Sequence, residues 1–347
     1  MLYLIAGLLS AFLISIFSIP SIIGVAKIKN LYDESNERKS HKGKVPTLGG
    51  VAIFAGLMIS ISLYSNSNYF SDFQFIIAAL LIIFFIGIKD DILMIAPIKK
   101  MLGQFLAASI VVVFGGIKIT SFYGVFGLNS ISSGVQIPLT IFTIIVINNA
   151  INLIDGVNGL CAGIGVTVFT TLGIWFYNIE LQNWALMSFS LVGALLGFLK
   201  YNITPAKIFL GDTGSLTIGF LSAILIIIFI ESSNTVTESG LSVNPVMAIG
   251  ILMIPLFDTL RVFSIRILRK QSPFTADKNH LHHKLIGLGL SHEVSSLILT
   301  LVNLIFIVVS FMFHGLNPNL LLVVFVILAG VFILILDLIS RKYESNK

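Results

Sequence analysis

Acidic and amide side chains gather in a few short segments of a chain that otherwise carries little charge. Asp90 and Asp91 follow an apolar run, Asp212 lies in IFLGDTGSL, and Asp258 lies in PLFDTLR. The segment NNAINLIDGVNGL adds amides and one carboxylate, namely Asn148, Asn149, Asn152, Asp155 and Asn158. Carboxylate and amide oxygens are hard ligands that suit Mg²⁺ or Mn²⁺. These residue types therefore predict a divalent-cation site.

Three histidines indicate the charge of the ligand. His280, His282 and His283 lie in NHLHHKL, in a part of the chain that is also rich in lysine and arginine. Such groups near a divalent cation suit a multiply charged phosphate substrate. Zinc is a weaker alternative, because adjacent histidines ligate one ion awkwardly and no cysteine accompanies them.

The aspartate segments also have plain structural explanations. GDTGS lacks the lysine of a phosphate-binding P-loop. Asp212 or Thr213 could simply cap a helix, although a helix N-terminus between glycines can also hold phosphate or metal-phosphate. Asp90 and Asp91 could be an interfacial pair balanced by Lys89, or two repelling carboxylates that a cation would stabilise. Their occurrence together favours the functional interpretation.

The overall composition predicts a membrane protein. Of 347 residues, 56% are hydrophobic and 11% are charged, and the mean hydropathy is +1.01. An average soluble domain carries about 25% charged residues. The composition excludes a soluble globular enzyme and a disordered chain, and no basic run is large enough to follow a nucleic-acid backbone. The single cysteine excludes disulfides.

Apolar runs recur along the whole chain and predict an all-α, polytopic membrane protein with about eleven transmembrane helices. Pro255 should kink or break the ninth of them. The runs cover residues 3–23, 47–65, 75–88, 102–117, 138–153, 160–177, 184–199, 213–230, 246–264, 295–313 and 319–338.

Basic residues predict the orientation in the membrane. If the helices alternate from an N-terminus outside, every Lys and Arg except Lys118 falls on the inner side, which also places the C-terminus in the cytoplasm. The aspartates, amides and histidines fall on that side too. We therefore expect one transmembrane domain, residues 1–347, with an active site formed by cytoplasmic loops at 24–46, 89–101, 148–160, 200–213 and 261–294.

Six segments in order resemble the polyprenyl-phosphate N-acetylhexosamine-1-phosphate transferases, of the glycosyltransferase family 4 type. They are KVPTLGG (44–50), KDD (89–91), NAINLIDGVNGL (149–160), PAKIFLGDTGSL (205–216), PLFDT (255–259) and SPFTADKNHLHHKL (272–285). The resemblance covers nearly the whole chain. It implies transfer of an N-acetylhexosamine-1-phosphate, GlcNAc-1-phosphate as first choice, from a UDP-amino sugar to membrane undecaprenyl phosphate. UMP would be released, in a first membrane step of a cell-envelope glycan pathway at the bacterial inner membrane.

The resemblance also implies roles for individual residues. Asp212 matches the family's metal aspartate for Mg²⁺, with Mn²⁺ as the alternative, and Asn152 matches the amide that assists it. Asp90 and Asp91 match an aspartate pair near the lipid phosphate, of which one could act as a base. The remaining matches are expected to bind substrate: Asn149, Asp155, Asn158 and Asp258, then Lys42 or Lys44 with Thr47, and finally Lys100 with His280, His282 and His283 at the diphosphate.

Two departures from the family pattern refine the prediction. Many relatives read DGxDG where this chain has Asn158, so that position lacks a carboxylate. The related phospho-MurNAc-pentapeptide transferases carry three consecutive histidines, whereas Leu281 interrupts the set here. The interrupted histidine set, with its TADKNHLHH context, places the chain nearer the GlcNAc-1-phosphate branch.

Several alternatives stay open at this point. The pentapeptide transferase is one, and it differs in its donor. A polytopic transporter is another, but its ionisable residues would line a pathway near the midplane rather than gather at one interface. A scaffold without activity would not need intact metal and phosphate positions. The expected partners are the UDP-sugar, the prenyl phosphate and the bilayer, without nucleic acid, and a homodimer is compatible with the sequence.

Overall fold

The apolar runs form helices, because a bilayer offers no water to unpaired backbone groups and a helix satisfies its own. The computed structural model describes residues 1–32, 45–65, 70–203, 205–232, 243–272 and 279–345. Its α-helices are α1 (Leu2–Ile28), α2 (Gly49–Tyr64), α3 (Phe70–Leu93), α4 (Pro97–Ser109), α5 (Ser133–Leu153), α6 (Leu160–Asn178), α7 (Gln182–Asn202), α8 (Gly211–Glu231), α9 (Pro245–Ile251), α10 (Met253–Leu268), α11 (Leu281–Gly287), α12 (His292–Met312) and α13 (Pro318–Ser345).

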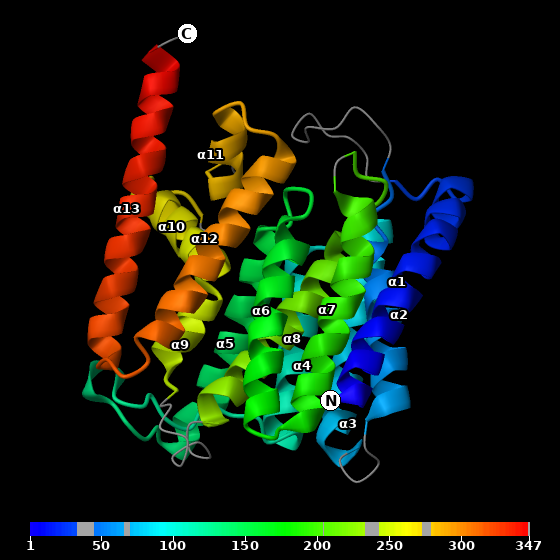
Figure 1. The fold of residues 1–347 in the computed structure, drawn as a ribbon, viewed down its shortest axis with the longest axis horizontal. Helices are drawn as coiled ribbons and strands as arrows, with labels where there is room; N and C mark the ends of the chain where they lie inside the picture. The colour runs from blue at the N-terminus through cyan, green and yellow to red at the C-terminus, as the bar shows by residue number, and fades with distance from the viewer. Residues whose placement is uncertain (33–44, 66–69, 204, 233–242, 273–278, 346–347) are drawn as a thin grey trace.

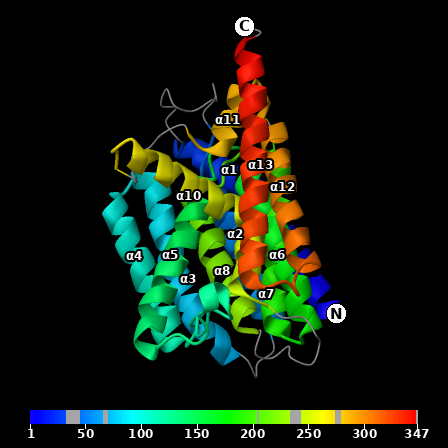
Figure 2. The same ribbon diagram turned by 90° about the vertical axis from the view of Figure 1, so that its left-hand side faces the viewer.

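Helix α8 is the centre of the bundle. It packs against α2, α3, α5 and α6, and 94% of its most apolar stretch is buried, against 17% for α13. Figure 1 shows α1 and α2 on one flank and α12 and α13 on the other. The two chain termini lie at opposite ends of the bundle, as Figure 2 also shows. Whatever α8 carries at its ends is therefore surrounded by several other helices.

The helical, multi-pass character predicted from composition is confirmed, but the number of spans is not. Eight helices of the described residues are long and apolar enough to cross a membrane, or nine if the bent pair α9–α10 counts as one span. Helix α2, with 16 residues, is shorter than a typical span. Eleven spans and their orientation therefore stay predictions. The described ranges contain no strand, only one isolated β-bridge between Ser121 and Ser130.

The ninth apolar run is broken, in the turn before the predicted proline. Helices α9 and α10 meet at an angle of 89° on either side of Leu252. Pro255 lies in the first turn of α10, where its missing N–H costs no helical hydrogen bond. Asn303 of α12 spans the break: its Nδ2 donates to Ile251 O (3.0 Å) and its Oδ1 accepts from Ile254 N (3.0 Å). The predicted break is confirmed, and it lies in the turn that precedes Pro255.

Candidate active site

The N-terminus of α8 is capped by a carboxylate from another helix. Asp91, near the end of α3, accepts hydrogen bonds from Asp212 N (2.6 Å), Thr213 N (3.0 Å) and the Thr213 hydroxyl. The first N–H groups of a helix have no partner within the helix, so Asp91 satisfies two of them. Asp212 and Thr213 were the alternative candidates for this cap. The hypothesis that they cap α8 themselves is wrong, and Asp212 is left with its carboxylate turned elsewhere.

Close backbone contacts hold the start of α8. Gly49 N donates to Phe209 O (3.0 Å), Gly50 N to Leu210 O (2.9 Å), and Phe209 N to Pro46 O (2.7 Å). The PTLGG and IFLG segments therefore lie side by side. Gly211 has φ +72°, and a Cβ there would lie 2.0 Å from Thr47 O and 2.6 Å from Asp91 Oδ1. Only glycine fits, because both its conformation and its neighbours exclude a side chain.

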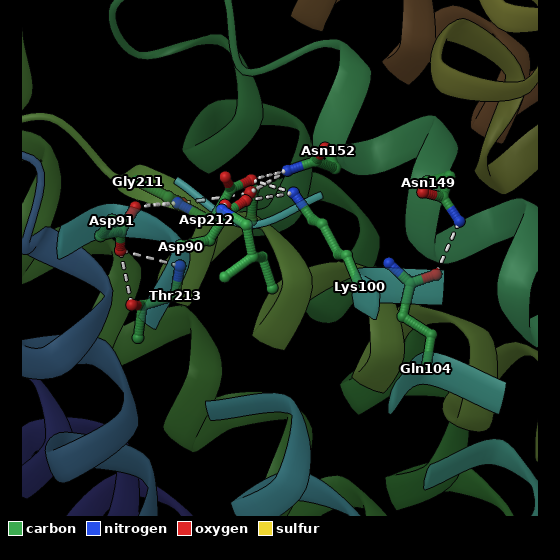
Figure 3. A network of polar contacts seen from close by, with 11 residues as sticks. Asp90, Asp91, Lys100, Gln104, Asn149, Asn152, Gly211, Asp212 and Thr213 are labelled. Atoms are coloured by element: carbon green, nitrogen blue, oxygen red, sulfur yellow. Dashed lines mark hydrogen bonds and ion pairs between the residues drawn. The ribbon is translucent and has the colours of Figure 1, made fainter. Parts of the chain in front are cut away.

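Three neighbouring helices, α3, α4 and α5, bring charged and amide groups to Asp212 of α8. Lys100 of α4 donates to Asp212 Oδ1 (2.6 Å) and to Asp90 Oδ2 (3.2 Å). The Nδ2 of Asn152, on α5, donates to the same Asp212 oxygen and to Ser215 Oγ (2.7 Å). Figure 3 shows these side chains converging. We call Asp90, Lys100, Asn152 and Asp212 the ionic cluster.

Asp90 also fixes the connection between α3 and α4. Its Oδ1 accepts from Ile95 N (2.6 Å), in the short link that leads to Pro97. Lys100 follows in the first turn of α4. The same carboxylate thus closes the link through one oxygen and meets the ammonium through the other. This arrangement explains how residues ten positions apart come to share the site.

The histidines form a second group, built on α10 and α11. Asp258 is 1% exposed, and its two oxygens bind His280 Nδ1 (2.8 Å) and Leu281 N (3.0 Å). Asp258 therefore holds the beginning of α11 against α10. This geometry favours a positioning role, while the predicted substrate contact of Asp258 stays a prediction.

The three histidines differ in exposure. His282 is 2% exposed, with ring centroids 5.5 Å from His280 and 4.3 Å from His283. Burial, followed by the neighbouring His283 and His280, lowers the pKa of His282 to about 2, so its ring is neutral. His280 is also buried, whereas His283 is partly exposed. Of the trio, His283 is the best placed to meet a ligand.

The DGVNG segment connects the two groups. A Cβ on Gly156 would lie 2.6 Å from His282 Nε2, so this turn packs directly on the histidine ring. Asp155 is partly exposed and Asn158 is buried. Asn152, three residues before Asp155, belongs to the ionic cluster. This segment, which was predicted to bind substrate, therefore lies between the ionic cluster and the histidines.

Some residues of the site were missed or lie elsewhere. Gln104 of α4 accepts a hydrogen bond from Asn149 Nδ2 (2.7 Å), beside the ionic cluster (Figure 3). Its position four residues after Lys100, on the same helix face, is the signal that could have found it. Thr47 meets the start of α8 through its backbone oxygen. The predicted Lys42 and Lys44 lie outside the described residues.

Carboxylates alone do not make a metal site here. In the part of the chain that the structure describes, no group of three His, Cys, Asp or Glu side chains is arranged to hold a metal ion. Ligation by Asp212 would need amide oxygens or substrate oxygens as further ligands. Such sites are typical of Mg²⁺, which uses one or two carboxylates together with phosphates.

An apolar helical bundle with an ionic cluster at one end of its central helix defines a multi-pass membrane protein with a polar reaction site. The family described as glycosyl transferase family 4 matches residues 73–230, which include the whole ionic cluster. A relative in Bacillus subtilis (strain 168), a probable undecaprenyl-phosphate N-acetylglucosaminyl 1-phosphate transferase, is 35% identical over 85% of this chain and 82% of its own length. The chain belongs to this glycosyl transferase family, as its motifs predicted.

Further relatives carry a similar name. The undecaprenyl-phosphate alpha-N-acetylglucosaminyl 1-phosphate transferase of Escherichia coli (strain K12) is 29% identical over 80% of this chain and 75% of its own length. The protein of that name in Yersinia pestis is 28% identical over 78% of this chain and 73% of its own length. The similarity extends over most of the chain in each case.

Proposed function

We propose that this protein transfers GlcNAc-1-phosphate from UDP-GlcNAc to undecaprenyl phosphate and releases UMP. The observation that carries this proposal is the ionic cluster, in which Asp90, Lys100, Asn152 and Asp212 meet at one end of the bundle. The names of the relatives support the sugar and the lipid. The site would face the cytoplasm of a bacterial inner membrane, where the nucleotide sugar is available.

The central problem of this reaction is charge. A phosphate monoester on the lipid must attack a diphosphate, and both are anionic. Lys100 provides an ammonium group at the place where two carboxylates converge. Its position allows it to contact substrate phosphates once a stronger cation takes over the carboxylates. In our proposal Lys100 therefore offsets phosphate charge during transfer.

The donor set fits a divalent cation. Asp212 Oδ1 accepts from both Lys100 and Asn152, so it is the oxygen on which the donors of the cluster converge. Asp212 would hold Mg²⁺ or Mn²⁺, and Asn152 would turn its amide oxygen toward the ion. When bound, the ion neutralises phosphate charge and stabilises the departing UMP.

Asp91 and Asp90 have different roles in this proposal: one positions Asp212 and the other contacts the substrate. All the oxygens of Asp91 are engaged by the start of α8, so we propose that it holds Asp212 in place. Asp90 faces Lys100 and is the better placed of the pair to meet the lipid phosphate. A strong base is not required, because a phosphate monoester with a second pKa of about 6 is largely deprotonated at neutral pH.

His283, with His280 behind it, would bind the diphosphate of the donor. Asp155 and Asn158 lie between the histidines and the ionic cluster, where the nucleotide would connect the two. Asn149 also borders this region, although its amide nitrogen already donates to Gln104 and to Ile145 O (2.8 Å). The amide oxygen of Asn149 is therefore the group that it would offer to a substrate.

The proposal is tested by UMP release from purified protein in lipid nanodiscs. The reaction contains undecaprenyl phosphate and one of UDP-GlcNAc, UDP-GalNAc or UDP-MurNAc-pentapeptide, with Mg²⁺, Mn²⁺ or EDTA. We expect UMP from UDP-GlcNAc with either ion and none with EDTA. UMP only from the pentapeptide donor would establish the related transferase instead. If no donor yields UMP, the proposed enzymatic activity is refuted.

A further inference from the structure

Helix α4 carries Lys100 and buries few of its own residues. Of its residues only Gln104, Ala107 and Ala108 are buried, whereas Leu102 is 62% and Phe105 52% exposed. The lysine side chain itself has four rotatable bonds. Where its ammonium lies therefore depends on how firmly the backbone of α4 is set against the bundle.

Gln104 connects α4 to α5 by a side-chain hydrogen bond. Its Oε1 accepts from Asn149 Nδ2 (2.7 Å). Gln104 lies four residues after Lys100, about 6 Å further along the helix, and Asn149 lies one turn before Asn152. Figure 3 shows the two contacts beside each other. Helix α4 is thus attached at two levels, once through Lys100 to the ionic cluster and once through Gln104 to α5.

Burial of the Gln104 amide costs free energy. The side chain is 1% exposed, and its Nε2 has no hydrogen-bond partner among the described residues. A buried unpaired donor costs about 1–3 kcal/mol. An apolar side chain of similar size would avoid this cost, so what distinguishes the glutamine is its bond to Asn149.

We propose that Gln104 is a positioning residue of this transferase: through Asn149 it fixes α4 so that the Lys100 ammonium stays between Asp90 and Asp212. The inference deepens the proposed function and rests on it. Gln104 touches neither the reacting atoms nor the ion. It acts on the reaction only through Lys100.

The proposal has a consequence that a structural role alone would not have. Lys100 and a divalent cation bind the same oxygen, Asp212 Oδ1, so they compete for it. When α4 is loosened, the ammonium spends less time on that oxygen. Cation affinity should then rise while turnover falls, because the misplaced lysine no longer offsets the substrate charge.

Gln104→Met tests this directly. Methionine keeps the length of the side chain, and Asn149 Nδ2 retains Ile145 O as the acceptor for one of its two N–H groups. Mn²⁺ affinity is measured without substrates by electron paramagnetic resonance of free Mn²⁺. We expect binding about tenfold tighter and kcat about tenfold lower, the lower end of what outer-shell substitutions do, with little change in KM for UDP-GlcNAc.

Ser60→Ala is the matched control. Ser60 is buried and donates to Gly7 O (2.8 Å), between helices far from α4 along the chain. This variant also removes a bond between helices, but it should leave Mn²⁺ affinity and kcat unchanged. An effect of Gln104→Met no larger than that of the control would overturn the proposal.

The transposed pair Gln104→Asn with Asn149→Gln adds a rescue. It keeps an amide-to-amide bond of the same combined length. Mn²⁺ affinity should return to the wild-type value, and this readout does not depend on any substrate contact of Asn149. Failure of the pair to restore it would also contradict the proposal. If the wild-type protein releases no UMP, the proposed function fails, while the Mn²⁺ measurements still report whether Gln104 positions Lys100.

Discussion

The two ends of α8 each carry one carboxylate, and their surroundings differ. Glu231, at the C-terminal end, accepts from Thr120 N (2.8 Å) and Thr120 Oγ1 (2.6 Å), so one residue satisfies both of its oxygens with neutral donors. Asp212, at the N-terminal end, shares an ammonium with Asp90 and lies next to Asp91 in space. Glu231 joins a loop to the helix. Asp212 belongs to a group whose negative charge exceeds its positive charge.

This difference shows how a structural carboxylate can be told from a reactive one. Carboxylates satisfied by neutral donors of one segment gain little from a cation. Carboxylates that converge from separate helices repel each other, and an added cation relieves the repulsion. The same helix therefore has a structural carboxylate at one end and a candidate cation site at the other. Substitutions at the two ends should have unequal effects on turnover.

The largest expected effect is the loss of turnover in Asp212→Asn. The substitution removes the charge that would hold the cation, so UMP release should fall by at least 10²–10³-fold, about the cost of removing one charge-stabilising group. Glu231→Gln, at the other end of α8, should keep turnover near the wild-type rate. Circular dichroism checks that both variants are folded. Near-normal transfer by Asp212→Asn would contradict the assignment of Asp212.

A comparison of two glycines tests whether the close contacts at the N-terminal end of α8 matter for stability and turnover. Gly211 and Gly124 both have positive φ, +72° and +86°, but a Cβ on Gly124 would meet no atom within 4 Å. Alanine at either position should cost about 1–2 kcal/mol for the left-handed conformation. Gly211→Ala must also displace Thr47 O and Asp91.

We therefore expect Gly211→Ala to unfold at a clearly lower temperature and to lose most of its UMP release. Gly124→Ala should show the smaller loss of stability and normal turnover. Thermal unfolding in detergent, with turnover measured on the same samples, compares the two. Equal losses in both variants would show that the contacts around Gly211 do not matter.

The buried His282 gives the site end its own pH dependence. The folded protein keeps this ring neutral, because its pKa is lowered to about 2, whereas an unfolded histidine titrates near 6.5. Below pH 6.5 the unfolded state binds a proton that the folded state does not, so stability falls as the pH falls. The loss approaches about 1.4 kcal/mol per pH unit.

His282→Gln removes this titration. The difference in unfolding free energy between wild-type and variant should therefore shift in favour of the variant as the pH is lowered from 7.5 to 5. Chemical unfolding at several pH values measures it. Parallel pH curves for the two proteins would show that His282 is protonated in the folded state or exposed to water.

The smallest expected effect concerns Glu231, at the C-terminal end of α8. A double-mutant cycle with Glu231→Gln and Thr120→Val isolates the bond between the Thr120 hydroxyl and Glu231. Side-chain hydrogen bonds in membrane proteins average about 0.6 kcal/mol in such cycles. We expect a coupling of that order in thermal unfolding and no change in UMP release. A large loss of turnover would mean that this end also takes part in the reaction.

The sequence predicted which residues belong to the candidate site, but not which of them contact one another. Asp90, Asp91, Asn152 and Asp212 stand out in the sequence because so few charged and amide side chains interrupt the apolar runs. That Asp91 caps α8 while Asp90 meets Lys100 could not be predicted, because neighbouring residues on a helix point about 100° apart and only the packing of α3 decides which faces which partner. Gln104 was missed because its one sequence signal, a position four residues after Lys100, does not show which neighbouring helix it meets.

The break in the ninth run teaches the same lesson. Proline predicts that a helix is interrupted, but not where, since proline is tolerated in a first turn. The break falls at Leu252, where Asn303 of α12 satisfies backbone groups on both sides. A distant side chain therefore stabilises the broken backbone next to the proline.

By itself the sequence determined that this protein is a helical membrane protein, that it belongs to the glycosyl transferase family, and which acidic and amide residues are available for chemistry. These properties follow from residue types and their order, since the length of the apolar runs and the order of the motifs do not depend on packing. Tertiary structure alone decided that Lys100 joins Asp90 to Asp212, that Asp91 and Asp258 hold helix starts, and that Gln104 ties α4 to α5. The physical reason is that each of these contacts joins different helices, and their distances depend on how the helices pack.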